Sequence, residues 1–139
     1  MTVAPLLLDT CAAMYIIANG QMRDEAVAAI DAASDHGEPV FISPITAWEV
    51  GTLARKCRFR SSYTPQRWFE RLMRSPNAAL AAMTPELLLA SSFLPGDFHN
   101  DPADRIIAAT AREYGYTVVT RDRALLAYGE AGHIRALAC

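Results

Sequence analysis

Short uninterrupted apolar runs alternate along the chain with longer stretches in which apolar residues recur every three or four positions. The first pattern is typical of a strand buried on both faces, as in a parallel sheet, and the second of an amphipathic helix. Pro5–Leu8 is the first such run, and Asp9 ends it. The predicted strands are Pro5–Leu8, Pro39–Ile42, Ala78–Met83, Tyr116–Val119 and, as an edge strand, His133–Leu137.

Helix start signals precede several of the amphipathic stretches. A Ser, Thr or Asp followed by Pro supplies a capping side chain and then a residue whose φ already suits the first helical position. Three helices are predicted over Thr10–Ala18, Gln21–Asp35 and Arg121–Tyr128. Four more are predicted to start at Ser43-Pro44, Thr64-Pro65, Thr84-Pro85 and Asp101-Pro102. The first of these four extends to about Lys56, and the third ends near Pro95-Gly96.

Strands and helices therefore alternate, which is the pattern of a parallel sheet covered by helices on both faces. No linker, repeat or low-complexity tract interrupts the chain, and 139 residues is the size of one ordinary domain. We expect a single domain over residues 1–139, folded as a three-layer α/β/α sandwich with a central parallel sheet of four to five strands. In such folds, ligands bind at the carboxyl ends of the strands.

Composition and charge narrow the function classes. Hydrophobic residues make up 52% of the chain and charged residues 20%, which is typical of a folded protein. The formal net charge is -2 and the pI is about 5.9, so an overall basic surface for nucleic acid is excluded. Any contact with nucleic acid needs a local source of positive charge, such as a metal ion.

The sequence shows no pattern typical of a targeting or membrane-spanning segment. The first 22 residues contain no Lys or Arg, and no apolar stretch reaches roughly 18 residues, so neither a signal peptide nor a transmembrane helix is expected. The three cysteines, Cys11, Cys57 and Cys139, share no C-x-x-C spacing, which disfavours a disulfide framework or a zinc site. We expect a cytoplasmic protein with no membrane partner.

Four carboxylates fall near the carboxyl ends of predicted strands. Asp9 and Asp122 follow the first and fourth strands, Glu49 lies in the helix after the second strand, and Asp104 lies in the first turn of a later helix. Clustered carboxylates repel one another, and burying them unpaired is costly. Divalent cations such as Mg²⁺ prefer oxygen ligands of this kind. The spacing therefore favours a metal site at this edge of the sheet.

Each carboxylate also has a purely structural interpretation. Asp9 could cap the following helix, Glu49 could be a solvated helix charge, and Asp122 could be a surface turn residue. Asp104 in a first turn favours the helix dipole by roughly a few tenths of a kcal/mol, and Asp101 is assigned to helix capping. Spacing alone leaves the two interpretations open.

These residues stand in blocks that resemble the PIN-domain family, specifically the VapC-type toxin ribonucleases of toxin–antitoxin pairs. The first block, Leu7–Thr10, reads Leu-Leu-Asp-Thr, and the second, Ser43–Glu49, ends in Trp-Glu. The third, His99–Arg105, has the pattern His-x-Asp-Pro-x-Asp-Arg and leads into an Ile- and Ala-rich helix. The fourth, Val118–Asp122, is a strand that ends in Thr-x-Asp. The blocks follow the family's order and span nearly the whole chain.

The resemblance implies a metal-dependent endoribonuclease whose products carry 5′-phosphate and 3′-hydroxyl ends. Thr120 would support the site by hydrogen bonding. Relatives form homodimers and are inhibited by a small antitoxin, so a second copy and a cognate antitoxin are the expected partners, with tRNA among the candidate RNA substrates. The residues implied to hold Mg²⁺ or Mn²⁺ and to carry catalysis are Asp9, Glu49, Asp104 and Asp122.

An Arg-rich segment over residues 55–74 is a second candidate surface. Aromatic residues interleave with its arginines, a composition that fits binding of RNA or of the antitoxin. The other interpretation is an amphipathic helical hairpin with a solvated basic face. His99, beside the acidic block, is expected to hydrogen-bond locally. The residues chosen for the RNA or antitoxin surface are Arg55, Arg58, Arg67, Trp68 and Arg71.

Other functions lack residues that they require. An aspartyl-nucleophile phosphatase would need an acid at Cys11, and a phospho-receiver domain would need a Lys late in the chain, where none follows Lys56. A dinucleotide-binding fold would need a G-x-G-x-x-G, which does not occur. The remaining alternative is a catalytically inactive PIN domain that serves as a scaffold or RNA-binding module. Loss of an acidic ligand would be its signature, and all four acids are present.

Overall fold

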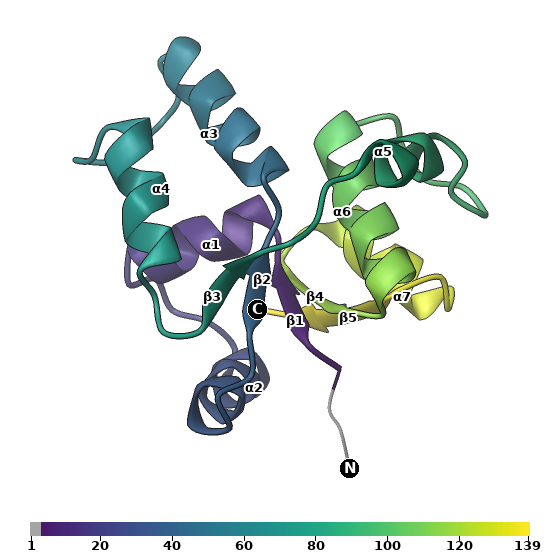
Figure 1. The fold of residues 1–139 in the computed structure, drawn as a ribbon, viewed down its shortest axis with the longest axis horizontal. Coiled ribbons are helices and arrows are strands. Elements are labelled where there is room, and N and C mark those ends of the chain that lie inside the picture. Colours follow the sequence, from purple (N-terminus) through teal and green to yellow (C-terminus); the bar gives the residue numbers. More distant parts are fainter. Residues whose placement is uncertain (1–3) are drawn as a thin grey trace.

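A parallel sheet forms the centre of the computed structural model, which describes residues 4–139. Its five strands lie in the order β3-β2-β1-β4-β5, and every neighbouring pair is parallel (Figure 1). The predicted parallel sheet is therefore confirmed, with β5 at one edge as expected. The strands are β1 (Leu6–Leu8), β2 (Val40–Ile42), β3 (Ala78–Leu80), β4 (Thr117–Thr120) and β5 (Arg135–Ala138).

Helices connect the strands and cover both faces of the sheet. In Figure 1, α1, α3 and α4 lie on one side, α5, α6 and α7 lie on the other, and α2 lies below the first group. No helix within residues 4–139 is long and apolar enough to cross a membrane. The helices are α1 (Thr10–Ile17), α2 (Asp24–Asp35), α3 (Ile45–Arg55), α4 (Pro65–Met73), α5 (Pro85–Ser92), α6 (Pro102–Tyr114) and α7 (Arg123–Glu130).

The alternation of side chains along β1 creates two separate cores. Leu7 packs with residues of α6 and α7, whereas Leu6 and Leu8 pack with residues of α1, α2 and α4. All three leucines are buried, because a central parallel strand has helices on both faces. The uninterrupted apolar run of β1 is the sequence signature of this environment, and the three-layer prediction is confirmed.

Three of the predicted capping signals begin helices as expected. Thr64, Thr84 and Asp101 each accept a hydrogen bond from the backbone N–H three residues later, at 3.0–3.3 Å. The fourth signal is displaced by one residue. Helix α3 begins at Ile45, whose N–H donates to the Ser43 hydroxyl at 3.1 Å.

Several predicted boundaries are wrong. Strand β3 ends at Leu80 instead of Met83, and β5 runs over Arg135–Ala138 instead of His133–Leu137. Helix α7 runs over Arg123–Glu130 instead of Arg121–Tyr128, because Asp122 caps its start.

Long-range hydrogen bonds explain two further differences at helix ends. Helix α2 begins at Asp24 instead of Gln21, because the Gln21 carbonyl accepts from the Arg121 guanidinium at 2.8 Å. Helix α5 ends at Ser92 instead of near Gly96, because the carbonyls of its last turn accept from Arg105. Neither arginine is near its partner in sequence.

Candidate metal centre

All four predicted carboxylates lie at the carboxyl edge of the sheet. Asp9 directly follows β1, and its N–H donates to the Val119 carbonyl of the neighbouring strand β4 at 3.2 Å. The thiol of Cys11, at the start of α1, reports the combined charge of the cluster. Burial, and then the four carboxylates, raise the pKa of Cys11 to about 11. The contributing carboxylates are those of Asp9, Glu49, Asp104 and Asp122.

Asp9 is the most enclosed of the four, with 3% of its surface exposed. Its Oδ1 accepts from the Ala12 N–H at 2.8 Å and so caps α1, while its Oδ2 accepts from the Thr120 hydroxyl. Burial raises the pKa of Asp9, the hydrogen bonds from Thr120 and Ala12 oppose this, and the charge of Asp122 raises it further. Asp9 therefore caps α1 and also belongs to the acidic cluster.

Glu49 is held by a hydrogen bond that crosses from α1 to α3. Thr10 donates its hydroxyl to Glu49 Oε1 at 2.5 Å, and Thr46 Oγ1 lies 3.0 Å from the same Thr10 oxygen. Burial raises the pKa of Glu49, the Thr10 hydrogen bond lowers it, and the charges of Asp101 and Asp9 raise it. The interpretation of Glu49 as a freely solvated helix charge is wrong.

Asp104 and Asp122 face one another across the starts of α6 and α7. Ligand atoms of Asp104, Asp122 and His99 all lie within 4.8 Å of one another. Burial, and then the neighbouring carboxylates, raise the pKa of Asp104 to about 7. Asp122 also caps α7, since its Oδ2 accepts from the Leu125 N–H at 2.9 Å.

One buried hydroxyl joins two of the acidic loops. Thr120, fully buried at the end of β4, donates to Asp9 and accepts from the Asp122 N–H at 2.9 Å. The orientations of Asp9 and Asp122 are thereby coupled. Such bonds fix the direction of a carboxylate before any ligand arrives.

The cluster has little positive charge of its own. Over residues 4–139, the one basic side chain within 4.0 Å of an acid in this cluster is His99, whose Nε2 lies 3.3 Å from Asp104 Oδ2, and no Lys or Arg pairs with any of these acids. Several partly buried carboxylates with raised pKa values and no basic partner form an oxygen-rich donor set. That donor set fits a hard divalent cation, which would relieve the repulsion.

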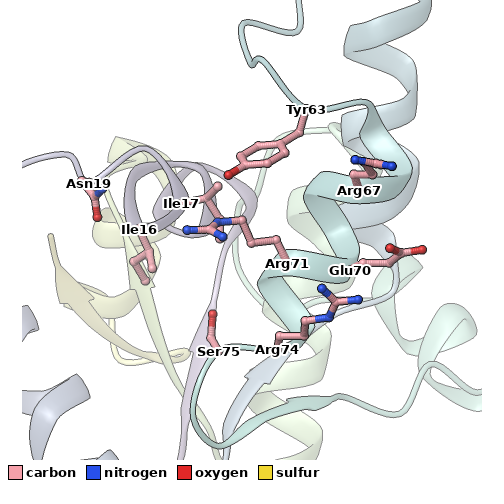
Figure 2. A pocket seen from close by; sticks show the side chains of 9 residues that line it. All are labelled: Ile16, Ile17, Asn19, Tyr63, Arg67, Glu70, Arg71, Arg74 and Ser75. Atoms are coloured by element: carbon pink, nitrogen blue, oxygen red, sulfur yellow. The ribbon is translucent and has the colours of Figure 1, made fainter.

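Two of the predicted basic residues line a groove of about 640 Å³ between α1 and α4. Figure 2 shows Arg67 and Arg71 on α4 and Arg74 just after it, with the Arg71 side chain extending toward Ile17 at the end of α1 and Tyr63 above it. The Arg71 guanidinium lies 5.4 Å from the centroid of the Tyr63 ring, a cation–π distance. Arg55 and Arg58 are exposed but do not line this groove.

Trp68 does not belong to a binding surface, and that prediction is wrong. Its exposed fraction is 2%, and it packs edge-on against Phe59 with ring centroids 6.0 Å apart. Leu72, one turn later on α4, is also buried, while Arg67 and Arg71 are exposed. Helical periodicity thus separates the aromatic from the arginines.

His99 hydrogen-bonds locally, as expected, because its Nδ1 accepts from the Asp101 N–H at 3.2 Å. The sequence interpretation did not predict its contact with Asp104 or the role of Arg105, which donates to the carbonyls of Ser91, Phe98 and His99 at 2.9–3.1 Å. Both residues stand in the His-x-Asp-Pro-x-Asp-Arg block, which was the available signal.

The fold and the acidic edge place the molecule among the α/β proteins with a carboxylate cluster at the carboxyl ends of a parallel sheet. The sequence model of the PIN domain matches residues 6–131, so the chain belongs to the PIN-domain family. It is also a homologue of Ribonuclease VapC22 from Mycobacterium tuberculosis (strain ATCC 25618 / H37Rv). The two are 31% identical over 120 residues, which cover 86% of this chain and 88% of that protein.

Solved structures share the fold at lower identity. VapBC2 from Rickettsia felis, bound to a DNA fragment from its promoter, aligns with a TM-score of 0.68 at 15% identity, over 96% of this chain and 97% of that one. FitAcB from Neisseria gonorrhoeae aligns with a TM-score of 0.57 at 21% identity, over 95% and 96%. DNA-bound VapBC from Salmonella typhimurium aligns with a TM-score of 0.56 at 20% identity, over 98% of both chains.

Proposed function

We propose that this protein is a VapC-type toxin, a metal-dependent endoribonuclease that hydrolyses RNA phosphodiester bonds. The observation that carries the proposal is the cluster of four carboxylates at the carboxyl edge of the sheet, with no Lys or Arg paired to it over residues 4–139. Membership of the PIN-domain family and the likeness to Ribonuclease VapC22 support the choice of RNA as substrate. The activity would reside in a single cytoplasmic domain over residues 1–139.

The metal would be Mg²⁺ or Mn²⁺, held by the four carboxylates. Such an ion lowers the pKa of a bound water and offsets charge on the phosphoryl oxygens. Thr120 and the Ala12 N–H hold Asp9 in place, and Thr10 does the same for Glu49. These bonds preorganise two ligands on different helices. The raised pKa values mean that the metal displaces protons when it binds, so its affinity rises with pH.

The expected regulatory partner is a small antitoxin. Structural relatives include VapBC2 from Rickettsia felis bound to a fragment of its promoter DNA and DNA-bound VapBC from Salmonella typhimurium. On this chain, the groove between α1 and α4 offers Arg67, Arg71 and Arg74 beside the apolar Ile16 and Ile17. That mixture suits an RNA strand or an antitoxin segment with acidic and apolar side chains. RNA, with tRNA as a candidate, would be the substrate.

A second copy of the chain is the other expected partner. Helix α5 and the residue after it expose large apolar side chains, with 40% of Leu88, 66% of Leu89 and 82% of Phe93 accessible. Trp48 on α3 is 56% exposed. Exposed apolar side chains that gather on one element mark interaction surfaces more often than monomer surface. We assign the exposed apolar face of α5, with Leu88, Leu89 and Phe93, to a homodimer contact.

Cleavage of a pool of structured cellular RNAs, including tRNA, by the antitoxin-free protein tests the function. Parallel reactions contain Mg²⁺, Mn²⁺ or EDTA, and the Asp9→Asn variant serves as the control. We expect discrete cuts that need the metal and disappear in the variant. Absence of cutting together with absence of Mn²⁺ binding would favour the inactive scaffold instead. Absence of cutting with Mn²⁺ binding intact would indicate a substrate narrower than the pool.

A further inference from the structure

The His99 side chain is held from several directions beside the acidic cluster. Its Nδ1 accepts the Asp101 backbone N–H at 3.2 Å, and its ring stacks on Phe98 with centroids 4.5 Å apart. Its Nε2 lies 3.3 Å from Asp104 Oδ2. The imidazole therefore presents Nε2, and not Nδ1, to the carboxylates.

These contacts assign the tautomer. A neutral imidazole carries one N–H, and its other nitrogen offers a lone pair. The Asp101 N–H already uses the lone pair of Nδ1, so the ring hydrogen is on Nε2. A nitrogen that carries hydrogen cannot ligate a metal. Although His99 lies within 4.8 Å of Asp104 and Asp122, it faces them as a donor.

Asp104 is the one carboxylate of the cluster that lacks a hydrogen bond to its oxygens within residues 4–139. Asp9 accepts from Thr120 and Ala12, and Asp122 accepts from Leu125. Glu49 accepts from Thr10. A donor at His99 Nε2 would complete the same arrangement for Asp104.

Arg105 fixes the position from which His99 acts. Its guanidinium donates to the Ser91 carbonyl on α5 at 2.9 Å and to the carbonyls of Phe98 and His99 at 2.9 and 3.1 Å. The loop between α5 and α6 is thereby tied to the end of α5. The backbone of His99 cannot move without breaking these bonds.

We propose that His99 is a positioning residue for Asp104 and not a metal ligand. Its Nε2–H, 3.3 Å from Oδ2 in this structure, would close to a hydrogen bond with Asp104 and hold that carboxylate in place for the metal. The proposal rests on the proposed function, because it needs a metal at Asp104. Outer-shell partners of this kind are commonly worth about 10- to 100-fold in metal affinity.

Two substitutions of His99 separate the roles of its two nitrogens. In His99→Asn, the amide oxygen stands in for Nδ1 and keeps the bond from the Asp101 N–H, but the donor to Asp104 is lost. In His99→Gln, the longer amide places an N–H donor near the position of Nε2. Mn²⁺ binding to the purified, antitoxin-free protein is measured by calorimetry, with wild type and Asp104→Asn as references and melting temperatures as a check on folding.

We expect His99→Asn to weaken Mn²⁺ binding about 10- to 100-fold and His99→Gln to remain within a few-fold of wild type. Equal Mn²⁺ affinity of His99→Asn and wild type would overturn the proposal. Equal losses of Mn²⁺ affinity in both variants would also overturn it. That result would mean that the N–H donor of Gln does not replace His99, as expected if His99 ligated the metal directly. A wild-type protein that binds no Mn²⁺ would contradict the proposed metal-dependent function itself. This result differs from a failure of the His99 proposal, in which the wild type still binds Mn²⁺.

Discussion

Asp9 illustrates how one side chain serves both the helix and the cluster. Its Oδ1 caps α1 through the Ala12 N–H, and its Oδ2 accepts from Thr120. Each carboxylate oxygen has two lone pairs, so neither bond uses up its capacity to hold a cation. The structural and the metal-binding interpretations of an acid at a helix start are therefore compatible. The same holds for Asp122 at the start of α7.

Removal of one negative charge from the acidic cluster should abolish RNA cleavage without unfolding the protein. We expect Asp9→Asn and Asp104→Asn to abolish RNA cleavage. The melting temperature of metal-free Asp104→Asn should stay level or rise, because no hydrogen bond to the Asp104 oxygens is lost. The amide keeps the shape of the carboxylate and relieves repulsion among the raised-pKa acids. Cleavage rates and thermal melts in EDTA check this. Variants that cut RNA as fast as wild type would show that the metal-site assignment is wrong.

The metal-free protein should lose stability as the pH rises. Burial and neighbouring charge raise the pKa of Asp104 from 3.8 to about 7, and the pKa values of Asp9 and Glu49 are raised as well. The folded state therefore binds more protons than the unfolded state. The resulting stabilisation is complete below the unfolded pKa and is lost as the pH passes through the folded one.

Urea denaturation in EDTA at pH 5.5 and pH 8 measures this effect, with the lower pH expected to give the larger free energy of unfolding. Asp104→Asn should reduce the difference, because it removes the carboxyl group whose pKa is raised to about 7. A difference of the opposite sign would contradict the assigned direction of these pKa shifts.

At the scale of elements, α4 carries two functions on opposite faces. Trp68 and Leu72 are buried, while Arg67 and Arg71 line the groove beside α1 (Figure 2). The mixed composition of this helix alone does not say whether its aromatic residue belongs to the core or to a binding surface. Helical spacing and the neighbouring Phe59 assign Trp68 to the core.

Truncation of Trp68 should therefore damage the fold. We expect Trp68→Ala to lower the free energy of unfolding by about 3–5 kcal/mol, since it leaves a large cavity in the core. Arg67→Ala, on the exposed face of the same helix, should change it by no more than about 0.5 kcal/mol. Denaturant titration of both variants measures this. A Trp68→Ala protein as stable as Arg67→Ala would place Trp68 outside the core.

At the scale of the whole molecule, the topology assembles the site. The strand order β3-β2-β1-β4-β5 places β1 beside both β2 and β4, so loops from distant parts of the chain meet at one edge (Figure 1). The Thr120 hydroxyl and the Asp9 carboxylate are 111 positions apart in sequence and still hydrogen-bonded. Parallel strands make this possible because all their carboxyl ends point the same way.

The apolar surface of α5 should decide the oligomeric state. Leu89 is 66% exposed and has no core role to lose, so we expect Leu89→Glu to convert a dimer into a folded monomer. Light scattering after size-exclusion chromatography measures the mass. Val27→Glu, at a 41% exposed site on α2, is the matched control and should leave the dimer intact. A wild-type protein that is monomeric at all concentrations would contradict the assignment of this face.

The sequence by itself determined the repeating units and their local ends. Uninterrupted apolar runs encode strands buried on both faces, and the capping residues Thr64, Thr84 and Asp101 begin helices because their bonds span only three residues. The local patterns also placed Asp9 and Asp122 after strands, and Glu49 and Asp104 near the starts of helices. The tertiary structure alone decided the partners: Arg121 and Arg105 set helix boundaries from a distance, and His99 reaches Asp104. These contacts depend on which loops the parallel topology brings together, a property that periodicity and capping do not encode.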